Sequence, residues 1–268
     1  MLDEAKVSWT SHVISLPKNE QYDPSYVRLN PRCVVPTLVV DGKVTTDAAN
    51  IIDFVDKNFM ESSSLYPSDS NEKETLDKFV VLGESLFVGA LSHGKVPGVE
   101  HGGTAKGAEG QKSTTSAILK KHDTKVGMLN DLIMNHKDDD YLKRCYEAKL
   151  QIVELTKENM STEENMQDVV DVTKAAFDEL AAQLKKGPFS AVESKEGWLC
   201  SETFSVADLL WGIVMFRLMK LRIGKELLWK DHDIVNSYAE KLFARESFKT
   251  GVLEWLNKMK KKPVWMEQ

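Results

Sequence analysis

The sequence predicts an α+β protein of two domains, in which a small strand-containing unit precedes a larger all-helical unit. An Asp-Gly dipeptide at 41–42 separates two short runs of β-branched residues, which is typical of a β-hairpin because both turn positions tolerate positive φ. Beyond about residue 70, apolar residues recur at helical spacing along most of the chain. A serine-rich stretch between these regions indicates a linker, so we expect domains of 1–62 and 63–268.

Composition and charge fit a cytoplasmic globular protein. The 268 residues are 42% hydrophobic and carry a net charge of -6, which argues against a nucleic-acid-binding surface. Cys33, Cys145 and Cys200 form no C-x-x-C motif, so free thiols in a reducing compartment are expected. The N-terminus shows no secretory leader. The most apolar run, 206–216, is too short to span a bilayer and predicts a buried helix.

The front unit is expected to contain three strands and a helix. Residues 6–16 mix β-branched and aromatic residues in partial alternation, which predicts a strand. The hairpin strands are expected at 37–40 and 43–46. A helix should follow from Asp47, because the next apolar residues share one helical face, namely Ile51, Ile52, Val55 and Phe59.

In the rear unit, the spacing of apolar residues predicts helices at 75–91, 116–134, 140–158 and 166–186. A glycine-rich loop is expected near 98–115, between the first two of these helices. The last of these helices carries an apolar stripe and should end at Gly187-Pro188; the stripe consists of Val169, Val172, Ala176, Leu180 and Leu184.

The clearest local signal is a helix start in "TFSVADLLW", residues 203–211. Ser205 can cap this helix, and the carboxylate of Asp208, three residues later, can reach back to the amide of Ser205. Phe204 and Leu209 occupy the positions of a hydrophobic staple. Satisfied first-turn amides would let the helix enter a core at little desolvation cost.

Two motifs together resemble the glutathione transferase superfamily: "NPRCVVPTLVVDGKVTTDAANII" at 30–52, and "WLCSETFSVADLLW" at 198–211 followed by "YAEKLFARESFK". Within the superfamily, "DPSYVRLN", "HGKVPG" and "ADLLWGIVMFRLMKL" are most similar to tetrachlorohydroquinone reductive dehalogenases. The "WLCxExFxxAD" pattern is similar to ganglioside-induced differentiation-associated proteins. The resemblance implies a thioredoxin-like N-terminal unit followed by an all-helical C-terminal domain.

The resemblance also implies a glutathione site. A cis Val35–Pro36 bond would leave the Val35 backbone free to pair with the cysteinyl residue of glutathione, although on the residues alone a trans proline beginning a strand is an equal interpretation. Asp47 would bind the ammonium group of the γ-glutamyl residue, and Ala48 would offer its amide to the carboxylate. Ala48 stands where the family has serine, and losing that donor costs roughly 1.5–3 kcal/mol, at least tenfold in affinity.

The thioredoxin-like unit is expected to be incomplete. In the family, a first strand and the catalytic Ser, Tyr or Cys precede the segment that matches residues 1–9, so no catalytic residue is assigned. That strand lies between the strands expected at 6–16 and 37–40, and both would then expose unpaired edges. Either the chain is shortened by an alternative start or gene model, or its front unit is impaired.

Other candidate sites are weaker. Cys33 could replace the missing thiol, but a plain loop cysteine is the alternative. The histidines lack the i, i+4 spacing of a metal helix, so no metal site is expected, and residues 107–113 lack the Gly-Lys step of a phosphate-binding loop. Trp211 and Phe216 could line an acceptor pocket, although their helical positions favour a core role.

The resemblance therefore implies a detoxifying enzyme with glutathione as co-substrate. It would conjugate glutathione to a small electrophilic aromatic substrate, or use glutathione to dehalogenate that substrate reductively. A homodimer is implied, with no nucleic-acid partner and no membrane span. The alternative is a non-catalytic glutathione transferase-like module that holds a ligand or a protein partner.

Overall fold

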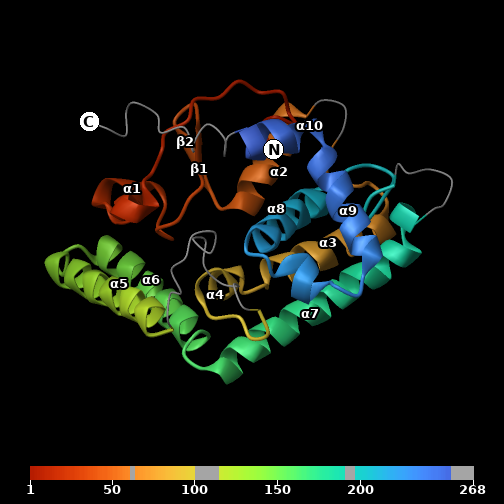
Figure 1. Ribbon diagram of the computed structural model, residues 1–268. Helices are drawn as coiled ribbons and strands as arrows, with labels where there is room; N and C mark the ends of the chain where they lie inside the picture. Colours follow the sequence, from red (N-terminus) through yellow and green to blue (C-terminus); the bar gives the residue numbers. More distant parts are fainter. Residues whose placement is uncertain (61–63, 100–114, 191–196, 255–268) are drawn as a thin grey trace.

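The computed structural model describes residues 1–60, 64–99, 115–190 and 197–254. A small region with one β-hairpin is followed by a much larger helical region, as Figure 1 shows. This order agrees with the α+β fold class expected from the sequence. The boundary predicted at 62/63 lies outside the described residues, between helix α2 (Ala48–Phe59) and helix α3 (Ser70–Glu84) in sequence.

The hairpin consists of β1 (Thr37–Val40) and β2 (Lys43–Thr46), which pair antiparallel with Thr37 opposite Thr46. Asp41 and Gly42 at the turn have φ of 50° and 78°. Two successive positive φ values are what a tight two-residue hairpin turn requires. The Asp-Gly signal therefore predicted the hairpin and the bounds of its two strands correctly.

Residues 6–16 do not form the strand that the sequence predicts. They run as irregular chain into two short 3₁₀ turns, η1 (Leu16–Lys18) and η2 (Glu20–Tyr22), and then into helix α1 (Pro24–Leu29). In the described part of the chain, β1 and β2 pair only with each other. Trp9 is 50% exposed, so the segment has neither a ladder partner nor a buried face, and β-propensity alone does not make a strand.

The helical region begins with α3 and continues through seven further helices. Their bounds are α4 (Val88–His93), α5 (Thr115–Asn135), α6 (Asp140–Glu158), α7 (Glu163–Lys186), α8 (Val206–Lys220), α9 (Asp233–Ala244) and α10 (Glu246–Phe248). Short 3₁₀ or π turns lie at η3 (Pro188–Ser190), η4 (Gly224–Leu228) and η5 (Lys249–Glu254). The glycine-rich loop predicted near 98–115 lies almost wholly outside the described residues.

Two helix predictions need correction. The single helix expected at 75–91 is broken after Ser85, whose hydroxyl donates to the carbonyl of Leu82 (2.8 Å) and competes with the helical ladder. In α7, Val172 is 53% exposed and does not belong to the buried stripe. Thr173 takes its place, and its hydroxyl is satisfied by the carbonyl of Val169 (2.7 Å), so a polar residue is tolerated there.

The main core lies among α3, α7, α8 and α9. Phe177 is packed edge-on against Trp211 with ring centroids 5.3 Å apart, and it also contacts Trp229 at 4.4 Å. Trp211 is fully buried, and its indole nitrogen donates to the carbonyl of Phe79 (3.0 Å), which supports the core role over a pocket role. Phe216 packs edge-on against Phe243, also in an aromatic cluster.

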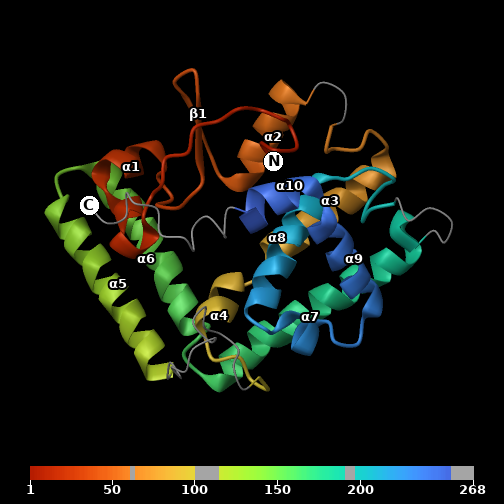
Figure 2. The same ribbon diagram turned by 45° about the horizontal axis from the view of Figure 1, so that its top comes forward.

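A second, smaller core joins the front region to the α5–α6 pair. Figures 1 and 2 both show α5 and α6 side by side, next to α1 and apart from the α7–α8–α9 bundle. The buried members of this second core are Tyr22, Val27, Cys33, Leu129, Leu142, Cys145, Tyr146 and Val153. The hydroxyl of Tyr146 donates to the carbonyl of Tyr22 (2.8 Å). The α5–α6 pair therefore supports the loop that leads from α1 into β1.

The described residues contain neither a membrane-spanning helix nor a cluster of metal ligands. None of the helices in these ranges is long and apolar enough to cross a membrane. No group of three His, Cys, Asp or Glu side chains in the same ranges is arranged to hold a metal ion.

Candidate functional site

The loop 30–36 between α1 and β1 is shaped by one buried side chain, Asn30, which is 0% exposed. Its amide nitrogen donates to the carbonyl of Val34 (2.7 Å) and to the hydroxyl of Thr37 (3.1 Å). Its amide oxygen accepts the backbone N–H of Arg32 (3.2 Å). A single amide thus closes the loop on itself, in keeping with the Asn-Pro dipeptide that begins it.

Tyr26 of α1 completes this arrangement. Its hydroxyl donates to the carbonyl of Val34 (2.8 Å) and lies 2.9 Å from the hydroxyl of Thr37. The carbonyl of Val34 is therefore held from two sides, while the next residue, Val35, is 41% exposed. The Val35–Pro36 bond is cis, as the resemblance implies. Among the described residues, neither the N–H nor the C=O of Val35 has a hydrogen-bond partner.

The start of α2 forms the other half of the site. Ala48 is the first residue of the helix, and Asp47 precedes it with φ of 75° and ψ of 133°, a backbone conformation that side-chain-bearing residues rarely adopt. The carboxylate of Asp47 makes no capping bond to its own helix. It forms an ion pair with the guanidinium of Arg32 instead. Loop 30–36 and the start of α2 thus meet through their side chains.

Cys33 lies in this loop but faces the other way. Its thiol is buried in the second core, and the side chain is 1% exposed. Burial raises the pKa of the Cys33 thiol to about 11, although Lys149 on α6 opposes the shift. A thiol with that pKa is neutral at pH 7 and a poor nucleophile. These features favour the plain loop cysteine over a substitute catalytic thiol.

The other two cysteines are also packed in the helical region. All three thiols are free, and burial raises the pKa of Cys145 and of Cys200. Neither of these residues lies in loop 30–36 or at the start of α2, so the described site contains no reactive thiol of its own.

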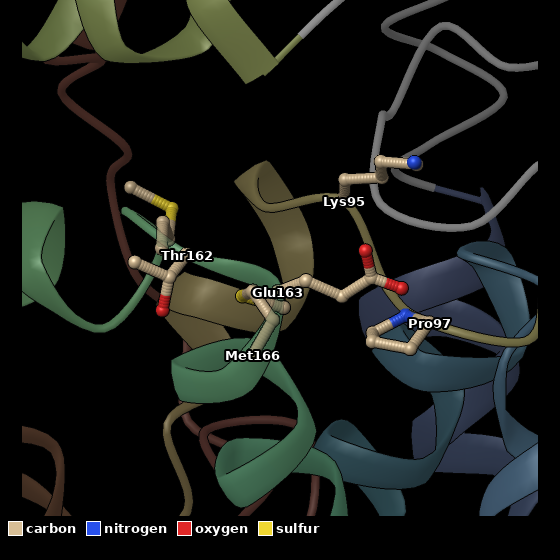
Figure 3. A pocket seen from close by; sticks show the side chains of 6 residues that line it. Lys95, Pro97, Thr162, Glu163 and Met166 are labelled. Carbon is tan, nitrogen blue, oxygen red and sulfur yellow. The ribbon is translucent and has the colours of Figure 1, made fainter.

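Two cavities formed by described residues lie elsewhere. The larger, of about 220 Å³, lies where α7 begins, and Figure 3 shows the Glu163 carboxylate in it between Lys95 and Pro97. A smaller one, of about 80 Å³, borders Phe204, Arg245 and other residues of the α8–α10 region. Neither is lined by Val35, Pro36, Asp47 or Ala48. At the candidate site, Val35 is exposed, and its backbone groups are unpaired among the described residues.

Sequence reasoning missed the residues that build this surface. Tyr26 carries no local signal, because its contacts depend on the loop folding back onto α1. Asn30 stands before a proline, which marks a turn but does not reveal what its side chain will bind. Arg32 is visible as a nearby cation, but its pairing with Asp47 joins positions 15 residues apart.

The family model described as "Glutathione S-transferase, N-terminal domain" matches residues 1–58, a range that includes the loop, the hairpin and most of α2. The β-etherase LigF from Sphingobium sp. strain SYK-6 has the same fold, with a TM-score of 0.62, 19% identity, and coverage of 93% of this chain and 90% of that one. Residues 1–58 thus match the glutathione S-transferase N-terminal family. Gtt2 from Saccharomyces cerevisiae is a further structural match, with a TM-score of 0.57, 16% identity, and coverage of 93% of this chain and 90% of that one.

Curated relatives are similar to this chain along most of its length. The "2,5-dichlorohydroquinone reductive dechlorinase" of Sphingobium indicum is 25% identical, over 95% of this chain and 78% of the relative. The "tetrachloro-P-hydroquinone reductive dehalogenase" of Sphingobium chlorophenolicum is 26% identical, over 87% and 80%. The human "ganglioside-induced differentiation-associated protein 1-like 1" is 25% identical, over 88% of this chain and 64% of the relative.

Proposed function

We propose that this chain binds glutathione on the surface formed by loop 30–36 and the start of α2, and that it presents the glutathione thiol to a small electrophilic aromatic substrate. The observation that carries the proposal is the backbone of Val35, which is exposed and unpaired among the described residues and held in place by Asn30 and Tyr26. An exposed strand-like edge of this kind can accept an extended peptide as an additional strand.

Each part of glutathione has a counterpart on this surface. The N–H and C=O of Val35 would pair with the cysteinyl residue, next to Pro36. The carboxylate of Asp47 would accept hydrogen bonds from the γ-glutamyl ammonium, and the Ala48 amide at the start of α2 would face the γ-glutamyl carboxylate. Because the loop is already fixed by buried hydrogen bonds, little conformational entropy would be lost on binding.

The reaction would begin with the glutathione thiolate. Its sulfur would attack an electron-poor ring carbon to form a C–S bond, and a halide would leave with the electrons of the broken C–X bond. Conjugation ends there. In reductive dehalogenation, a second glutathione thiolate attacks the bound sulfur, which yields glutathione disulfide, and a proton is added to the ring carbon. The names of the dechlorinase and dehalogenase relatives support the second route.

The location and assembly are proposed with the function. Three buried free thiols suit a reducing compartment, so we place the protein in the cytoplasm. A homodimer remains a prediction from the resemblance.

The test is glutathione binding by titration calorimetry, followed by turnover with 1-chloro-2,4-dinitrobenzene and with tetrachlorohydroquinone. Asp47→Ala should weaken glutathione binding about 10- to 100-fold, because it removes a charge-assisted hydrogen bond. Asp53→Ala is the matched control, since Asp53 is an exposed carboxylate on α2 that pairs with Lys57.

The outcomes separate the two hypotheses. Binding with turnover supports the enzyme. Binding that depends on Asp47 without turnover of either substrate supports the non-catalytic binding module. Absence of glutathione binding by the folded wild-type chain would overturn the proposal.

A further inference from the structure

The ion pair between Arg32 and Asp47 is an unusual feature of the proposed glutathione site. It connects the two halves of the site and is open to solvent, with side-chain exposures of 59% and 38%. An exposed ion pair contributes only about 0–1 kcal/mol to stability. A ligand that offers charges of its own can therefore replace either partner at little cost.

The charges around this pair favour an anion. Lys149 of α6 lies within electrostatic range of both Arg32 and Lys125 of α5. Burial lowers the pKa of both lysines, and among the described residues neither forms an ion pair with a carboxylate. Asp47 is thus the carboxylate that pairs with Arg32, while Lys149 adds positive charge within electrostatic range of the guanidinium. A ligand that takes Asp47 from the pair would leave the Arg32 guanidinium available to another anion.

The backbone of Arg32 is fixed, whereas its side chain is exposed to solvent. Its N–H is bound by the amide oxygen of the fully buried Asn30 (3.2 Å). The Arg32 side chain therefore begins at a fixed backbone position, three residues before Val35, and its guanidinium reaches Asp47 at the start of α2. A planar guanidinium is well suited to bidentate binding of a carboxylate.

On these grounds we propose that Arg32 binds the α-carboxylate of the γ-glutamyl residue of glutathione, and so supplies the side-chain donor that Ala48 lacks. This inference rests on the proposed function. The ammonium and the carboxylate of the γ-glutamyl residue are attached to the same carbon atom. A glutathione whose ammonium reaches Asp47 therefore brings its α-carboxylate to Arg32, which pairs with Asp47 in the free protein. One protein ion pair is exchanged for two between protein and ligand.

The experiment is titration calorimetry on the full chain with three probes. They are glutathione, 4-aminobutyryl-cysteinyl-glycine, which lacks only the α-carboxylate, and glutaryl-cysteinyl-glycine, which lacks only the ammonium. Arg32→Ala should weaken the binding of glutathione about 10- to 100-fold and the binding of the 4-aminobutyryl probe less than about twofold. Arg32→Lys should restore part of the loss. Arg144→Ala is the control, because it removes an exposed arginine of α6 from outside the site.

Three results would overturn the inference. If Arg32→Ala loses affinity equally for glutathione and for the 4-aminobutyryl probe, the Arg32 side chain affects only the shape of the loop. Unchanged or tighter glutathione binding in Arg32→Ala would mean that Arg32 merely occupies Asp47. If the wild-type chain binds none of the probes, the proposed function itself is wrong. This outcome differs from the other two because it is measured without any variant. If Arg32→Ala does not fold, the same comparison of probes in Arg32→Lys decides.

Discussion

Asn30 shows how a side chain with no chemical role can define a binding surface. It is fully buried, and its amide uses both its donor and its acceptor on the surrounding loop. The same loop turns Cys33 inward and leaves Val35 outward. The side chains thus change from buried at Cys33 to exposed at Val35, and the hydrogen bonds of the Asn30 amide hold the backbone of this loop.

Asn30→Ala should therefore reduce the free energy of unfolding by about 1–3 kcal/mol, since buried polar groups lose their partners. Glutathione affinity should fall as well, because the Val35 edge is no longer held. Urea unfolding and calorimetry would measure the two effects. Asn50→Ala is the control: Asn50 makes one exposed bond to the carbonyl of Thr46 (3.3 Å), and its removal should change stability by less than about 0.5 kcal/mol. Equal effects in both variants would contradict this role for Asn30.

At the scale of elements, α8 depends on one buried carboxylate. Asp208 is fully buried and accepts hydrogen bonds from the amide (2.8 Å) and hydroxyl (2.6 Å) of Ser205, from the amide of Leu199 (3.0 Å) and from the hydroxyl of Tyr238 (2.6 Å). Burial raises the pKa of Asp208, and these hydrogen bonds oppose the rise. The start of α8, the preceding loop and α9 are therefore joined at one side chain.

Asp208→Asn should destabilise the protein by at least about 2 kcal/mol, because an amide group cannot accept four hydrogen bonds and leaves buried donors unsatisfied. Urea unfolding followed by circular dichroism would measure the change. Asp168→Asn, an exposed carboxylate on α7, is the control and should be nearly neutral. A loss of stability no larger than that of Asp168→Asn would show that the network is dispensable.

The elements also show how far the sequence could predict this structure. The hairpin and the contact of Asp208 with Ser205 were predictable, because both depend on neighbours within a few residues. The contacts of Asp208 with Leu199 and Tyr238 were not, since these residues lie 9 and 30 positions away. Residues 6–16 were predicted wrongly for the same reason, because a strand needs a distant partner that local composition does not reveal. Pro36, Asp47 and Ala48 came from the resemblance, whereas the pairing of Arg32 with Asp47 required the fold.

At the scale of the whole molecule, contacts near both ends of the front region bind it to the helical one. The hydroxyl of Tyr146 on α6 bonds to the carbonyl of Tyr22, and Arg28 of α1 pairs with Asp139 at the start of α6. Near the other end, the carboxylate of Glu4 is bound by the guanidinium of Arg245 after α9 (2.8 and 3.0 Å) and by the hydroxyl of Ser247. The early residues are thus held although they form no strand.

The Glu4 contact should make stability depend on pH. Burial alone would raise the pKa of Glu4, but the hydrogen bonds from Arg245 and Ser247 outweigh it and hold the pKa below the ordinary value of 4.5. A lowered folded-state pKa adds stability above pH 4.5, and that stability is lost as the pH falls through the folded value. Glu4→Gln should therefore cost about 1–2 kcal/mol at pH 7 and much less at pH 3.

Thermal or urea unfolding between pH 3 and 7 would test this dependence. Glu246→Gln is the matched control, because the Glu246 side chain is 82% exposed and, within the described residues, forms an ion pair only with Lys249, within one helical turn. The expectation for Glu4 fails if the difference from wild type stays constant across this range of pH.

The backbone of Asp47 has a consequence for attempts to engineer the protein. Its φ of 75° suits glycine, which has no Cβ to crowd the chain, and a glycine at this position would relieve local strain. The same exchange would delete the carboxylate that we propose receives the ligand. Stability and glutathione binding therefore favour different residues at position 47. Selection for heat resistance alone would favour variants that have lost their affinity for glutathione.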